Sequence, residues 1–201
     1  MSIGTVIADT IIRRAKLTPY FHLRGYMGRW WLMRIGKRNE DGSPSLLGAR
    51  VHNIVRSDDD RACHCHPWPY LAIILKGGYW EVREFPMNTR REIKRALRYG
   101  ERSGATVTFP QNGDHPKVMW VKRWHGPGSI LFRHSTDRHR LILPTCLPDE
   151  PIYDKSVWTL FFTGPKRKSW FFYTDNGPVN WRDYPPAIED NINDQQMKWP
   201  A

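Results

Sequence analysis

Short β-rich segments separated by turn residues are the feature that most constrains the fold of this chain. Each segment holds six to ten residues, is rich in branched or aromatic side chains, and is bounded by Gly, Pro, Asn or Asp. The segments are 26–35, 49–56, 68–76, 78–85, 117–124, 129–134, 138–143, 157–163 and 169–174. Nine strands in 201 residues predict one all-β domain, built as a sandwich or barrel.

The two ends of the chain differ from this strand-rich middle. Apolar residues between 3 and 16 recur at close to helical spacing, and Thr18-Pro19 ends the pattern. Residues 1–25 are therefore expected to form an N-terminal helical segment, 26–174 the β-barrel domain, and 175–201 an irregular C-terminal tail rich in Asn, Asp and Pro. Residues 86–104 are charged, and we expect an excursion from the sheet there, with one helical turn near Ile93–Leu97.

A glycine pair marks one turn. Lys76-Gly77-Gly78-Tyr79 has the composition of a two-residue hairpin, because glycine adopts the positive φ that such a turn requires. The segments on either side are therefore predicted to pair with each other.

Charge and cysteine content point to partners and compartment. No run of about twenty apolar residues occurs, and three cysteines give no disulfide framework, so a cytoplasmic protein without a membrane segment is expected. The net charge of +11 favours anionic partners. The basic segments 90–102 and 164–173 could contact nucleic acid, although such charge is more often a solvated surface.

Two histidines precede the strand that begins near residue 68. In an extended chain alternate side chains share a face, so His64 and His66 point the same way while Cys63 and Cys65 face the opposite side. Two imidazoles can converge on a divalent ion, but two ligands rarely hold it alone, so a third ligand is expected from elsewhere. His139, in the segment 126–143, is the candidate. The alternative is that these histidines are simply polar residues at a barrel rim.

These segments resemble the two sequence motifs of the cupin superfamily, a jelly-roll barrel. His64, His66 and Gly77 match the first motif, G-x5-H-x-H-x(3,4)-E-x6-G, while Tyr70, or Leu71 in the longer spacing, stands at its glutamate position. Gly128 and His139 match two positions of the second motif, G-x5-P-x-G-x2-H-x3-N. The string that contains HCHPW, ILKGGYWE, GSILFR and WTLFFTGP is also similar to small cupin-like proteins of bacteria and phages.

The resemblance implies an all-β, cupin-type double-stranded β-helix with a short N-terminal helix and a metal site of His64, His66 and His139. Its cofactor would be a divalent metal, first of all Fe(II), with Zn(II), Mn(II) or Ni(II) as alternatives. A site of three histidines resembles the thiol dioxygenase branch of cupins. Tyr70 would then lie near the ion as a hydrogen-bond donor that assists catalysis. If the glycine hairpin forms, Glu81 lies roughly 13 Å along the sheet from Tyr70, too far to be a ligand.

Six further residues are substrate-binding candidates: Trp68, Tyr79, Glu81, Arg133, His134 and Arg50. Aromatic rings can stack on a planar substrate and arginines can clamp a carboxylate or phosphate, although strand aromatics are usually core and arginines usually form surface pairs. Asp137 either orients His139 or forms a turn, and His115 and His125 are expected on the surface.

The leading functional hypothesis is a non-haem Fe(II) oxygenase acting on a small anionic or thiol substrate. The alternatives are a binding module for a sugar phosphate, nucleotide or nucleic acid, a metal-assisted isomerase or hydrolase, and an accessory protein without catalysis. A homodimer formed through the outer face of a sheet is a further possibility.

Overall fold

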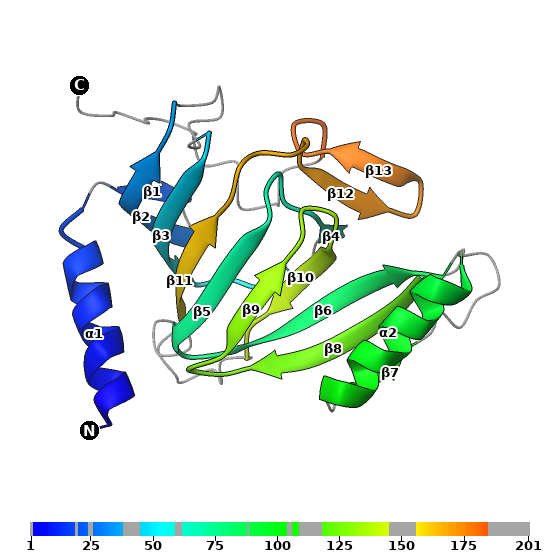
Figure 1. The fold of residues 1–201 in the computed structure, drawn as a ribbon, viewed down its shortest axis with the longest axis horizontal. Helices are drawn as coiled ribbons and strands as arrows, with labels where there is room; N and C mark the ends of the chain where they lie inside the picture. Colours follow the sequence, from blue (N-terminus) through cyan, green and yellow to red (C-terminus); the bar gives the residue numbers. More distant parts are fainter. Residues whose placement is uncertain are drawn as a thin grey trace.

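A computed structural model describes residues 2–18, 20–23, 26–37, 45–58, 62–87, 89–103, 106–108, 118–144 and 156–184. Two antiparallel sheets face each other, with one helix beside each (Figure 1). Within the described residues, neither helix is long and apolar enough to span a bilayer.

The first sheet has the strand order β1-β2-β3-β11-β5-β9. Its strands are β1 (Tyr20–Leu23), β2 (Met27–Ile35), β3 (Leu47–Ile54), β5 (Tyr70–Lys76), β9 (Ile130–Arg133) and β11 (Val157–Thr163). On β11 and β5, buried and half-buried residues alternate, as expected where one face of a strand is turned toward a core.

The second sheet has the strand order β13-β12-β4-β10-β6-β8-β7. Its strands are β4 (Cys63–His64), β6 (Tyr79–Pro86), β7 (Thr106–Thr108), β8 (Val118–His125), β10 (Arg138–Ile142), β12 (Phe171–Thr174) and β13 (Gly177–Asn180). β13 lies in the segment that the sequence assigns to an irregular tail, but it pairs with β12 through four residue pairs.

Eight of these strands form a jelly roll. Taken in chain order as β3, β4, β5, β6, β8, β9, β10 and β11, the first pairs with the last, the second with the seventh, the third with the sixth and the fourth with the fifth. This nesting is the pattern of an antiparallel ribbon folded over on itself. The expected all-β, cupin-type double-stranded β-helix with a short N-terminal helix is confirmed.

The predicted glycine hairpin is wrong. Gly77 does have a positive φ of 74°, and a Cβ there would lie 2.6 Å from the carbonyl oxygen of Ser156. However, β5 pairs with β9 and β11 in the first sheet, whereas β6 pairs with β8 and β10 in the second. The turn therefore carries the chain from one sheet to the other, a topology that a local turn signal does not reveal.

The two helices lie outside the barrel. α1 (Ile3–Ala15) begins at Ser2, whose hydroxyl accepts from the backbone N–H of Thr5, and it buries Ala8, Ile12 and Ala15. α2 (Arg90–Ser103) packs beside β6, β8 and β7, where the sequence was expected to form a single helical turn (Figure 1). The missed signal is a capping box, in which Glu92 accepts from the N–H of Thr89 and donates its own N–H back to the Thr89 hydroxyl.

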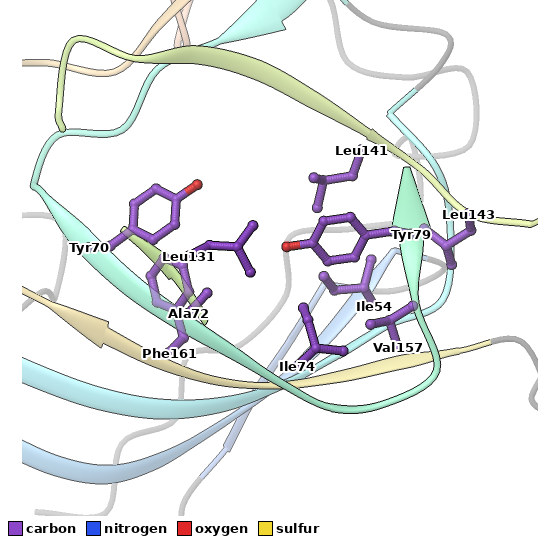
Figure 2. Close-up of a cluster of buried hydrophobic side chains, with 10 residues drawn as sticks. All are labelled: Ile54, Tyr70, Ala72, Ile74, Tyr79, Leu131, Leu141, Leu143, Val157 and Phe161. Carbon is purple, nitrogen blue, oxygen red and sulfur yellow. The ribbon is translucent and has the colours of Figure 1, made fainter. Parts of the chain in front are cut away.

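The main core lies between the two sheets. The first sheet contributes residues on β3, β5, β9 and β11, and the second contributes residues on and just after β6 and β10 (Figure 2). This apolar cluster consists of Ile54, Tyr70, Ala72, Ile74, Tyr79, Leu131, Leu141, Leu143, Val157 and Phe161. Tyr70 and Tyr79 enter it from opposite sides and direct their hydroxyl groups inward (Figure 2).

Candidate metal centre

Strand pairing brings together the three histidines that the sequence singles out. His64 on β4 lies directly opposite His139 on β10, and His66 follows β4 by two residues. One ring nitrogen from each histidine lies within 4.8 Å of the others. His64 and His139 are buried and His66 is partly buried, so the cluster faces the interior. We call these three residues the histidine cluster.

The cysteines beside this cluster face elsewhere, as strand alternation requires. The sulfur of Cys63 lies 4.0 Å from the carbonyl oxygen of Val82 on β6, the strand beyond β10 in the same sheet. Burial raises the pKa of the Cys63 thiol to about 12, so it stays protonated and is a poor metal ligand. Among the described residues, the histidine cluster contains neither cysteine nor carboxylate.

The geometry of His66 and His139 fits a shared ion. Their Nε2 atoms are 3.0 Å apart. Two nitrogens that each bind a metal at about 2.1 Å and subtend 90–110° are separated by about 3.0–3.4 Å. Burial, with the neighbouring histidines His139 and His64, lowers the pKa of His66 well below its usual range. The ring is therefore neutral, the form in which imidazole binds metals.

Glu81 fixes the orientation of His139. Burial alone would raise the pKa of Glu81, but the charge of Arg133 and hydrogen bonds from His125, His139 and Arg133 hold it well below its usual range. An ionised carboxylate only accepts, so the Nδ1–H of His139 must donate to Oε1 of Glu81, at 2.9 Å. In the neutral ring Nε2 then carries the lone pair, and it is the atom that faces His66.

The Glu81 carboxylate also accepts hydrogen bonds from two other side chains. Arg133 binds both oxygens, with Nε at 2.8 Å from Oε1 and Nη2 against Oε2. The Nε2–H of His125 donates to Oε2 at 3.1 Å. Glu81 is only 1% exposed, so its charge is compensated by partners rather than by water.

Two expectations about this network are wrong. The estimate that placed Glu81 about 13 Å along the sheet from Tyr70 assumed the glycine hairpin. Because β6 belongs to the other sheet, Glu81 instead lies opposite Leu141 on β10, two residues from His139. His125 is not a surface residue, because it is 3% exposed at the end of β8 and bound to Glu81. His115 lies outside the described residues.

Tyr70 approaches the cluster from the first sheet. Its hydroxyl oxygen lies 3.4 Å from Nε2 and 3.5 Å from Nδ1 of His139, and its ring is 4.8 Å from that of His66. Burial and the nearby Glu81 carboxylate raise the pKa of Tyr70 well above its usual range. The phenol therefore keeps its proton, as a hydrogen-bond donor beside the histidines requires.

Aromatic rings surround the histidines on the side of β12. Trp170 stacks on His66 with centroids 6.5 Å apart and contacts His64 at 5.8 Å. Trp181 stacks in turn on Trp170 at 5.8 Å. The sequence does not predict a role for these tryptophans, because they belong to segments that carry no metal-site motif and approach β4 only through its pairing with β12.

The remaining candidates are more dispersed. Arg50 is buried, with its guanidinium 4.5 Å from the ring of Trp31 and 5.4 Å from that of Trp68. Tyr79 belongs to the apolar cluster and contacts the ring of His125 at 5.9 Å. His134 is exposed and packs against Phe132.

Asp137 does not orient His139. One of its carboxylate oxygens pairs with Arg83 at 2.9 Å, and the other accepts from the backbone N–H of His134 at 2.9 Å. Of the two roles considered for Asp137, the structure shows the turn between His134 and Asp137.

Comparisons with known proteins concern the fold. No protein-family model matches the chain, and no curated protein matches it. Among solved structures, the chain is similar to the DMSP lyase DddQ from Ruegeria pomeroyi, with 16% identity, a TM-score of 0.46, and coverage of 92% of this chain and 72% of that one. It is also similar to an RmlC-like cupin from Shewanella frigidimarina, with 12% identity, a TM-score of 0.40, and coverage of 76% and 88%.

A third similar structure is the hydroxypropylphosphonic acid epoxidase from S. wedmorenis, with 12% identity, a TM-score of 0.38, and coverage of 74% of this chain and 56% of that one. The architecture itself follows from the nested strand pairing described above. The chain has the double-stranded β-helix fold of a cupin-type jelly roll, with three histidines gathered inside it.

Proposed function

We propose that this protein is a metal-dependent cupin enzyme, a non-haem Fe(II) oxygenase that acts on a small anionic or thiol substrate. The observation that supports it is the histidine cluster, in which Glu81 directs the lone pair of His139 toward His66. His64, His66 and His139 would hold the ion.

The donor set supports iron without selecting it alone. Imidazole suits iron, zinc, copper and nickel, and three protein ligands leave positions open on an ion that accepts more than three. Fe(II) bound there would supply the chemistry of dioxygen activation. Zn(II), Mn(II) or Ni(II) in the same place would instead support isomerase or hydrolase chemistry.

The surrounding side chains have separable roles in this proposal. Tyr70 keeps its proton and offers a hydrogen bond at the cluster. Glu81 orients His139 from behind, so it is a positioning residue rather than a substrate ligand. The ring of Trp170 packs on His64 and His66, and Trp181 stacks on Trp170, so these rings would support the orientation of the two ligands.

A second candidate is a binding module that uses a metal only to position its ligand. The observation that favours it is Arg50, a buried cation held against Trp31 and Trp68, since a guanidinium of this kind recognises carboxylate or phosphate groups. The ligand would be a sugar phosphate, a nucleotide or single-stranded nucleic acid. The two candidates share the metal site and differ in whether the ligand is converted.

Metal analysis tests the site. Protein purified without a histidine tag is expected to contain about one equivalent of divalent metal, and His139→Ala is expected to weaken metal affinity by more than about a hundredfold, beyond the loss typical of an outer hydrogen-bond partner. His134→Ala is the matched control, because His134 is exposed and packs on Phe132. A His139→Ala protein that keeps its full metal content would refute the proposed ligand set.

Oxygen consumption separates the two candidates. Iron-loaded protein supplied with a panel of small thiols, keto acids and hydroxy acids is expected to consume oxygen with at least one of them, and His139→Ala should not. Binding of such compounds with no turnover under any metal would favour the binding module.

A further inference from the structure

A pair of buried polar side chains lies on the interior side of the first sheet. His52 on β3 is directly opposite Thr159 on β11. They are 7% and 2% exposed. Among the residues that the structure describes, neither Nε2 of His52 nor Oγ1 of Thr159 has a hydrogen-bond partner. A buried polar atom without a partner costs about 1–3 kcal/mol, so two of them side by side call for an explanation.

The pair lies close to the histidine cluster. The ring of Phe161 is 4.7 Å from that of His52 and 6.2 Å from that of His66, so one aromatic side chain separates the pair from the proposed metal ligands. His52 also contributes to the electrostatic lowering of the pKa of His66. A small molecule with two functional groups could reach both places.

Positive charge and further donors surround the pair. Arg50 precedes His52 by two residues on the same face of β3, and its guanidinium is 5.9 Å from the ring of Phe161 and 5.4 Å from that of Trp68. The indole N–H of Trp68 is another buried donor without a partner among the described residues. The Trp68 indole, the Thr159 hydroxyl and, in one tautomer, Nε2 of His52 can all donate, and a ligand that satisfies them must be rich in acceptors.

The protonation state of His52 agrees with this chemistry. Burial, followed by the charges of Arg50 and Arg29, holds the pKa of His52 well below its usual range. The neutral ring offers one N–H without adding a charge of its own. The attraction for an anion then comes from the guanidinium, and the direction comes from the imidazole, the hydroxyl and the indole.

We propose that His52, Thr159 and Arg50 form an oxyanion subsite that binds the carboxylate, phosphate or phosphonate group of the substrate. The inference rests on the proposed function, because it assigns the reacting group to the histidine cluster and the anionic group to this neighbouring subsite. The substrate is then a small bifunctional acid that reaches past the ring of Phe161, which lies 4.7 Å from the ring of His52 and 6.2 Å from that of His66.

The test is anion binding by the metal-free protein. Acetate and inorganic phosphate are titrated by NMR, with acetamide as the uncharged analogue of acetate. At least one of the two anions is expected to shift the His52 and Trp68 side-chain signals with saturation, and acetamide is expected to bind at least tenfold more weakly. Thr159→Val, which removes only the hydroxyl, is expected to weaken anion binding by about tenfold or more, the effect of one hydrogen bond to a charged group.

Thr163 provides a matched control. It lies four residues further along the same strand and is equally buried, but its hydroxyl already donates to the carbonyl oxygen of Gly48 at 3.5 Å. Thr163→Val should leave anion affinity unchanged. In the absence of anion, Thr159→Val should raise the Tm because an unpaired buried hydroxyl is removed, whereas Thr163→Val should leave it unchanged or lower it.

A third variant separates this proposal from that of the metal centre. His139→Ala should lose metal and still bind the anion, and Thr159→Val should lose anion affinity and still bind metal. Unchanged anion affinity in Thr159→Val, or no saturable binding of either anion to the wild-type protein, would overturn the subsite whatever the metal content. If the wild-type protein binds the anion but no metal, the metal centre alone would be overturned.

Discussion

The apolar cluster and the histidine cluster occupy one barrel interior and share strand β10, yet they differ in what holds them in place. β10 supplies His139 to one and Leu141 to the other, two residues apart on the same face. Leu141 is fixed by non-directional burial, which many apolar side chains could provide. His139 is fixed by a hydrogen bond to a carboxylate that is itself held by Arg133.

The contrast shows that the apolar cluster stabilises the fold, whereas the buried charges beside the histidine cluster have a cost in stability. Each buried apolar side chain contributes about 1.5–3 kcal/mol. Burying Glu81 and Arg133 costs desolvation free energy that their mutual attraction offsets only in good geometry. The stability that the apolar cluster provides thus offsets the cost of a charged network that orients one imidazole, that of His139. The two regions should therefore respond differently to substitution.

The largest effect on stability is expected in the apolar cluster. Ile74 is 1% exposed, so Ile74→Ala should lower the free energy of unfolding by about 2–5 kcal/mol through lost burial and a cavity. Metal affinity of the folded fraction should change less than about threefold, because Ile74 belongs to the apolar cluster, which includes none of the three histidines. Urea unfolding and metal titration measure the two quantities. A large loss of metal affinity would show that the two regions are mechanically coupled.

At Glu81 we expect a smaller effect, and one that is measured in metal affinity rather than in the free energy of unfolding. Glu81→Gln removes the charge that fixes the tautomer of His139, so metal affinity should fall by about 10–100-fold. Competition with a chelator of known affinity measures the change.

Glu84→Gln is the control for this substitution, because Glu84 lies on the same strand and pairs with Arg138 on β10 at 2.6 Å. It should leave metal affinity unchanged, because Glu84 makes no contact with the histidine cluster among the hydrogen bonds of the described residues. Equal metal affinity in the two variants would mean that Glu81 has only a structural role.

The smallest effect is a pH dependence confined to the polar region. The folded-state pKa of His52 is depressed, so below about pH 6.5 the unfolded chain binds a proton that the folded protein excludes. The contribution of His52 to stability is therefore complete above pH 6.5 and decreases as the pH falls, by at most about 1.4 kcal/mol per pH unit.

Urea unfolding of the metal-free protein at pH 7.5, 6.5 and 5.5 measures this slope, which His52→Gln should reduce. The exposed His134 is the control, and His134→Gln should leave the slope unchanged. The deficit of Ile74→Ala should be the same at every pH, because no titrating group is removed. A slope unaffected by His52→Gln would contradict the assigned protonation state.

Local pattern in the sequence was enough to predict much of this molecule. All nine expected strands are present within a few residues of their expected ends, because alternation and turn residues are local properties. The same alternation placed His64 and His66 on one face and turned Cys63 away. The cupin motifs supplied the third member of the cluster, although His139 is 75 residues from His64.

The features that could not be predicted from the sequence are contacts that depend on which strands pair. The hydrogen bond between Glu81 and His139 could not be inferred. The glycine pair after β5 predicts a tight turn, and this signal does not say whether the next strand joins the same sheet or the other one. The burial of His125 and the positions of Trp170 and His52 follow from the same unknown. The capping box of α2 is a local signal, Thr89 followed by Glu92 three residues later, but it stands in a segment whose many charges also fit an irregular loop.

The nesting of first strand with last also determines when the interior can be completed during synthesis. β11 lies between β3 and β5, so a nascent chain that ends before Val157 lacks the strand that joins those two elements into one sheet. Until then His52 has no Thr159 opposite it, and the wall that carries Tyr70 is unsupported on one side. In ribosome-bound intermediates His64 and His66 would therefore be synthesised before the strand that completes the surrounding sheet. Strand pairing across more than a hundred residues would be the final step of folding.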